Sequence, residues 1–267
     1  MAHAVATGGV AVMINGIWDF LSDSANWNTT DGIPARLLEH LGYSFGAVLI
    51  ALLIALPLGL YIGHTGRGAT AVVGIANSVR ALPTIGLLYL VVLLLQAKLP
   101  AGVAYLWPTV LTLVVLAVPP ILSNTYAGVD GVDPAVRDAA YGMGMTGGQV
   151  LSRVEVPNAL PLIFSGLRSA VLQVIATATI AAYVSLGGFG YLIREGQQTR
   201  NYYEMAAGAV LVALLAVLCD LVLATIQRLA VSRGITGRYA RGTVTARGAA
   251  SGEVAEDVDL KQIGVPA

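Results

Sequence analysis

The sequence is poor in charge, in cysteine and in lysine, and each shortage excludes a class of protein. Only 11% of its 267 residues are Asp, Glu, Lys or Arg, whereas soluble domains carry roughly 25%. Much of the surface therefore does not face water. The 15 basic residues balance 15 acidic ones, which argues against a nucleic-acid partner. Cys219 is the only cysteine, so an internal disulfide and a thiolate metal cluster are both excluded.

The two lysines exclude a phosphate-binding loop. A Walker A motif requires Gly-Lys-Ser/Thr, but neither Lys98 nor Lys261 follows a glycine. Residues 142–147 match GxGxxG by letter, but a dinucleotide site needs that motif between a buried strand and a helix. We therefore expect no catalytic residue, no metal and no cofactor in this chain.

Apolar residues are abundant instead: 56% of the chain is hydrophobic and the mean hydropathy is +0.75. Long windows without charge and without polar stripes predict helices that cross a hydrocarbon core of about 30 Å. We expect an all-α integral membrane protein with five such helices, near 43–63, 69–97, 102–122, 162–186 and 206–228.

The first forty residues precede these spans. Their apolar run has no basic residue before it and is too short to span a bilayer, so we expect it to be neither a signal peptide nor a span. We expect residues 1–40 to form an extracytoplasmic arm in which Gly8–Leu21 is an interfacial helix or a loosely ordered segment. Residues 41–230 then form the transmembrane domain.

Basic residues gather on one side of the expected spans. The other side holds only Arg36, Lys98, Arg194 and Arg200. The positive-inside rule therefore predicts a multi-pass protein of the cell membrane with its N-terminus outside and its C-terminus in the cytoplasm. The tail, residues 231–267, is rich in Gly, Ala and charge, which is typical of a disordered extension.

One long connection, residues 130–158, carries its own helix signals. Asp133-Pro134 is an N-cap followed by proline at the first helical position. Gly144 breaks the helix that follows, Thr146 and Gln149 match a capping box, and Pro157 is expected to end a second short helix. Such a unit either docks in a groove of another protein or packs against its own bundle.

The same loop carries a family pattern. Asp138-Ala139-Ala140, then Gly144 after three residues and Val154-Glu155-Val156-Pro157 after nine more, resembles the EAA loop of type I ABC importer permeases, Glu-Ala-Ala-x3-Gly-x9-Ile-x-Leu-Pro. In that family the loop is a coupling helix that docks on the ATP-binding subunit. The resemblance therefore implies a type I ABC importer permease fold. It assigns seven residues to the ATPase contact: Asp138, Ala139, Ala140, Gly144, Val154, Val156 and Pro157.

Residues 40–228 are more narrowly similar to osmoprotectant permeases, through shorter stretches such as 77–83, 120–126 and 187–190. The resemblance implies import of a solute such as glycine betaine, choline, carnitine or proline betaine. It also implies three partners, namely an ATP-binding subunit dimer that holds ATP and Mg, a second permease copy or homologous permease, and an extracytoplasmic solute-binding protein. A type I importer for an amino acid such as methionine remains an alternative. A secondary transporter driven by an ion gradient is the other, and it would require internal repeats and buried acidic residues.

Charged and small residues inside the spans leave further alternatives open. Arg80 and Asp220 are either part of the transport pathway or structural. In the structural case Arg80 reaches the interface, and Asp220 pairs with a neighbouring helix or Arg228. Gly59 and Gly63 form a GxxxG pair that serves either close helix packing or a flexible gate.

Overall fold

The computed structural model describes residues 2–231, of which residues 2–10, 73, 75, 77 and 80 are described by their backbone alone. Within this part of the chain every regular element is a helix. Four stretches are long and apolar enough to cross a membrane: Ile33–Thr65, Ala101–Asp130, Gly147–Val184 and Tyr202–Ala230. The expected all-α membrane fold is confirmed, and four of the expected spans coincide with these stretches.

The helices have the following bounds: α1 Ala2–Ser22, α2 Ile33–Thr65, α3 Ala69–Arg80, α4 Thr84–Leu95, α5 Leu106–Asp130, α6 Pro134–Gly142, α7 Gly147–Val150, α8 Val156–Thr177, α9 Phe189–Thr199 and α10 Tyr202–Ala230. Shorter helical segments join them: η1 Ser24–Asn26, η2 Gln96–Lys98, η3 Ala101–Val103, η4 Leu151–Glu155 and η5 Ala178–Val184.

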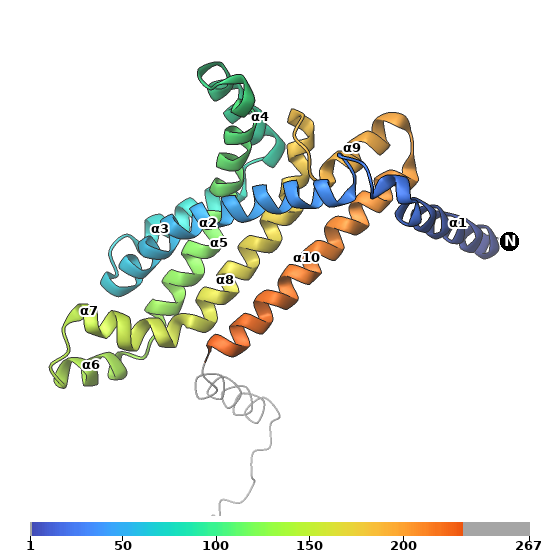
Figure 1. Ribbon diagram of the computed structural model, residues 1–267. Coiled ribbons are helices and arrows are strands. Elements are labelled where there is room, and N and C mark those ends of the chain that lie inside the picture. The colour runs from blue at the N-terminus through green and yellow to red at the C-terminus, as the bar shows by residue number, and fades with distance from the viewer. Residues whose placement is uncertain (1, 232–267) are drawn as a thin grey trace, which may run out of the picture.

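Helix α5 is central, because it packs against α2, α3, α4 and α8. Figure 1 shows α5, α8 and α10 side by side, with α6 and α7 at one end of the bundle and α9 at the other. These are called below the α6–α7 end and the α9 end. The apolar core lies mainly between α2, α5 and α8, around side chains such as Leu113, Ile121 and Ile175, which have no exposed surface.

The GxxxG pair lies in the contact between α2 and α5. A Cβ atom on Gly59 would come within 2.7 Å of the Thr125 Cβ, and one on Gly63 within 2.6 Å of the Val129 Cβ. Backbones this close leave no room for a larger side chain, as is common where membrane helices pack. The pair therefore serves close packing.

The second expected span, 69–97, is divided into α3 and α4. The residue before a proline is disfavoured in the α conformation, and proline has no N–H to continue a helix. Accordingly α3 ends at Arg80, Pro83 is extended with ψ 116°, and α4 begins at Thr84. Two helices thus stand where a single span was expected over 69–97.

The N-terminal arm is more helical than its sequence suggested. Residues 8–21 lie within α1, and the first membrane helix, α2, begins at Ile33, inside the expected arm 1–40. Gly32 caps α2, and a proline in its first turn needs no hydrogen-bond partner there. Of the expected tail, residues 232–267 lie outside the described residues.

Candidate functional site

The connection between α5 and α8 folds as two capped helices separated by a glycine. The Asp133 side chain accepts a hydrogen bond from the Ala135 N–H at 2.9 Å, which caps α6. The Gln149 side chain accepts from the Thr146 N–H at 2.8 Å, which caps α7. Gly144 lies between them with φ +81°, a left-handed conformation that glycine adopts without strain. The expected caps and the expected glycine break are confirmed.

Helix α6 presents small and apolar side chains to its surroundings. Asp138 and Ala139 are exposed, as is Gly144 beyond the helix, whereas Ala140 faces inward with 2% exposure. Two large side chains of the same segment, Tyr141 and Met143, are 47% and 72% exposed. The exposed side of α6 thus has the short side chains of Asp138 and Ala139, with two large side chains at its C-terminal end, a shape that a partner's groove can accept.

The second half of the pattern lies in the helix that leaves the loop. Val154, Val156 and Pro157 are half-buried and Ala140 is buried, so three of the seven residues of the pattern are exposed. The exposed three are Asp138, Ala139 and Gly144, whereas Val154 lies in η4 and Val156 and Pro157 are the first residues of α8.

The prediction that Pro157 ends the second short helix is wrong. The chain stays helical from Gly147 to Val184, and η4 is a π-helical turn in which the Val156 N–H bonds the Leu151 carbonyl. A π turn is wider than an α turn, which leaves room for the proline ring against the preceding turn. The Asn158 side chain also donates to the Val154 carbonyl at 2.6 Å.

Glu155 is the residue of this region that sequence reasoning missed. Its side chain is 1% exposed and lies between two partners: His64 Nδ1 is 2.6 Å from its Oε2, and Arg137 Nε is 2.8 Å from its Oε1. A buried carboxylate is costly unless it is paired. Glu155 occupies an unspecified position of the family pattern, and His64 lies 91 residues away in sequence, so no local signal indicates the contact.

The two charged residues inside the spans have different surroundings. Asp220 on α10 pairs with Arg168 on α8 at 2.8 Å, so the pairing with a neighbouring helix is observed and Arg228 is not the partner. The backbone of Arg80 ends α3, immediately before the break at Pro83. The side chain of Arg80 lies outside the described part, and its role stays a prediction.

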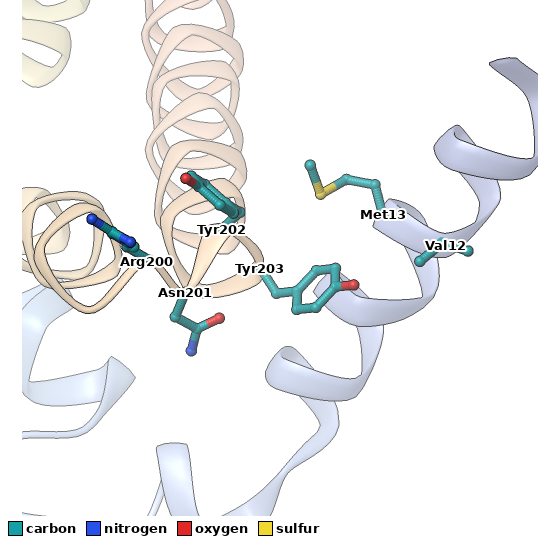
Figure 2. A pocket seen from close by; sticks show the side chains of 6 residues that line it. All are labelled: Val12, Met13, Arg200, Asn201, Tyr202 and Tyr203. Carbon is teal, nitrogen blue, oxygen red and sulfur yellow. The ribbon is translucent and has the colours of Figure 1, made fainter.

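A hollow of about 260 Å³ lies at the α9 end. It is lined by Val12, Met13, Arg200, Asn201, Tyr202 and Tyr203. Figure 2 shows the Tyr203 ring directed toward α1. The side chain of Asn201 accepts a hydrogen bond from the Glu204 N–H at 3.3 Å and caps α10. Because this amide is committed to the helix cap, we assign no solute to the hollow.

The described residues offer no candidate metal site. Across that part of the chain, His, Cys, Asp and Glu side chains form no group of three or more that could hold a metal ion. The seven residues of the loop pattern include a single carboxylate, that of Asp138, and no imidazole or thiol. What the loop offers is a shape for contact with another protein.

Known proteins are similar to this chain over most of its length. The sequence model of one protein family, "Binding-protein-dependent transport system inner membrane component", matches residues 47–235. The chain is 36% identical over 200 residues to the glycine betaine/carnitine/choline transport system permease protein OpuCB of Bacillus subtilis (strain 168), covering 74% of this chain and 88% of that protein. It is also 36% identical over 203 residues to the osmoprotectant import permease protein OsmW of Salmonella typhimurium, covering 76% and 94%.

Solved structures share the fold. An inward-facing structure of the MetNI methionine ABC transporter contains a chain that matches with a TM-score of 0.65 at 22% identity, covering 75% of this chain and 96% of that one. Identity at this level supports the arrangement of helices and nothing about the solute. The expected importer permease fold is confirmed.

Proposed function

Because the chain belongs to the family of inner membrane components of binding-protein-dependent transport systems, we propose that it is a permease through which an osmoprotectant enters the cytoplasm. The solute class is that named for its relatives, which include transporters of glycine betaine, carnitine and choline. ATP hydrolysis is assigned to a separate subunit, because neither lysine of this chain lies in a phosphate-binding loop.

The observation that carries the proposal is the unit α6–Gly144–α7. It is held by two side-chain caps, turns at a residue with φ +81°, and exposes Asp138 and Ala139. A capped helical unit whose exposed side chains are short suits a groove in a partner protein. This supports the assignment of α6 as the coupling helix that contacts the ATP-binding subunit.

The proposed complex contains three further components. A second permease copy, or a homologous permease, completes the pathway, an ATP-binding subunit dimer docks at the α6–α7 end, and a solute-binding protein delivers solute at the α9 end. ATP binding moves the docked helices as rigid bodies and opens the pathway outward, and hydrolysis resets it. This orientation follows from the expected placement of the α6–α7 end in the cytoplasm.

Two matched substitutions test the ATPase contact. Ala139 on α6 and Ala213 on α10 are both exposed alanines within helices. We expect Ala139→Leu to prevent co-purification of the co-expressed ATP-binding subunit, because a larger side chain blocks close approach of the two proteins. Ala213→Leu, on a helix with a largely apolar exposed face, should leave co-purification intact. Equal recovery of the ATPase with both variants would contradict the proposed contact.

The solute class needs its own measurement. Cells expressing the chain together with an ATP-binding subunit and a solute-binding protein should take up radiolabelled glycine betaine, choline or carnitine, and each of these solutes should compete with the others. Methionine should not compete. Uptake of methionine alone would replace the osmoprotectant assignment with that of an amino acid importer, the alternative left open by the sequence.

A further inference from the structure

Glu155 connects parts of the chain that are far apart in sequence. It belongs to η4, His64 to the last turn of α2, and Arg137 to the middle of α6. With 1% exposure for the carboxylate and 21% and 23% for its two partners, the cluster is largely shielded from water. Low exposure strengthens each of these electrostatic contacts.

Arg137 extends the cluster to a fourth element. Its Nη2 donates to the carbonyl of Val129, in the last turn of α5. A cation at the C-terminal end of a helix also interacts favourably with the unpaired carbonyls there. The coupling helix is thus attached to the ends of both α2 and α5 by side chains, in addition to its peptide connections.

Helix α2 is attached at its opposite end as well. Glu39 Oε2 accepts a hydrogen bond from the Gly188 N–H at 2.8 Å, and His40 Nε2 lies 3.0 Å from the Ile175 carbonyl oxygen. Gly188 lies in the segment between η5 and α9, with φ +83°. The two sets of contacts, at His40 and His64, are 24 residues apart within α2, which corresponds to about 36 Å. Figure 1 shows α2 reaching from the neighbourhood of α9 toward the α6–α7 end.

We propose that Glu155 is a positioning residue that makes α6 and α2 move together. Displacement of α6 by the ATPase is then carried along α2 to the segment around Gly188 at the α9 end. Helix α2 continues without a break from Ile33 to Thr65 although Pro57 lies inside it, and a continuous helix attached at both ends carries movement from one contact to the other. The inference rests on the proposed function, since it assumes that α6 contacts an ATPase.

A purely stabilising role would give a different result, and a double variant separates the two. Removing one partner of a buried pair leaves an uncompensated charge and destabilises the protein, whereas removing both does not. Arg137→Gln combined with Glu155→Gln therefore keeps the fold but removes the Arg137–Glu155 pair, through which α6 is connected by Glu155 to His64 of α2. The control is Asp130→Asn, which changes an exposed carboxylate beside the same loop.

The readout is a distance and needs no identified solute. Spin labels are placed at Leu38 on α2 and Leu214 on α10, both exposed, in a Cys219→Ala background. The labelled chain is diluted with unlabelled chain, assembled with the ATP-binding subunit in liposomes, and measured by pulsed electron paramagnetic resonance with and without ATP and vanadate.

We expect the nucleotide to shift the distance in the otherwise unaltered chain and in Asp130→Asn, and the double variant to lose the shift while still binding the ATPase. A full shift in the double variant would overturn the role of Glu155, as would the absence of any shift in the unaltered chain. Failure of the unaltered chain to bind the ATPase would instead overturn the proposed function, on which the inference depends.

Discussion

The guanidinium of Arg168 on α8 pairs with the carboxylate of Asp220 on α10, with Nε–Oδ1 and Nη2–Oδ2 distances of 2.9 and 2.8 Å. Gln227 joins the pair, accepting from Arg168 Nη1 at 3.3 Å and donating to the Pro161 carbonyl at 3.3 Å. The side chains of Arg168 and Asp220 are 32% and 29% exposed. Asp220 is therefore half of a connection between two membrane helices.

This pair gives a stability prediction. We expect Asp220→Asn to lower the free energy of unfolding by about 2 kcal/mol. This value lies between the cost of breaking a buried ion pair and the energy of one hydrogen bond between membrane helices. Thermal denaturation in detergent measures the change. Combining Arg168→Gln with Asp220→Asn should recover much of the loss, because no lone charge remains. Leu218→Ala, at an exposed position of the same helix, is the control, and a loss as large as that of Asp220→Asn would contradict the interpretation.

A second prediction concerns the contact between α2 and α5. Gly59→Ala places a Cβ 2.7 Å from the Thr125 side chain and 3.1 Å from the Leu122 carbonyl, so the helices must separate, at a cost of about 1–3 kcal/mol. Gly46→Ala, in the same helix, meets no atom within 4 Å and should stabilise by up to about 1 kcal/mol through the lower entropy of the unfolded chain. Equal midpoints for the two variants in thermal denaturation would refute the packing role.

The third prediction concerns Gly144. With φ +81°, a β-branched residue there is strained by about 1–3 kcal/mol, so Gly144→Val should re-aim α7 and abolish solute uptake while the protein still inserts in the membrane. Gly148→Ala, inside α7 and without neighbours within 4 Å, should keep uptake. Uptake assays with expression measured in parallel decide the matter. Normal uptake by Gly144→Val would remove the main support for the coupling role.

Topology is tested by thiol labelling. In a Cys219→Ala background, cysteines at the exposed positions Ser24 and Thr199 should react with an impermeant reagent added to intact cells. Cysteines at Gly131 and at Ser251, the latter outside the described residues, should not, because basic residues gather on that side. Labelling of Gly131 from outside would overturn both the orientation and the ATPase contact.

The last prediction concerns the energy source. The purified chain alone should not hydrolyse ATP, since Lys98 and Lys261 are not preceded by glycine. Phosphate release is measured with the chain alone and with its ATP-binding subunit, and only the mixture should be active. Turnover by a rigorously purified chain would mean that the catalytic subunit is not separate.

Local chemistry is what the sequence by itself determined. Apolar runs predicted the membrane helices because the bilayer imposes both length and composition. The caps at Asp133 and Gln149 and the turn at Gly144 involve neighbours only a few residues away, so they too could be predicted. The spacing of the loop pattern likewise indicated the family, and the comparisons agree.

Contacts between distant segments were decided by the tertiary structure alone. The helix partner of Asp220 lies 52 residues away and that of Glu155 on α2 lies 91 residues away, so neither is indicated by spacing. Pro157 shows the same limit at short range: proline predicts the end of a helix, but a π turn and the Asn158 side chain allow the helix to continue. Side-chain pairs of this kind depend on which helices are adjacent, and that is fixed only when α2, α5, α8 and α10 pack together.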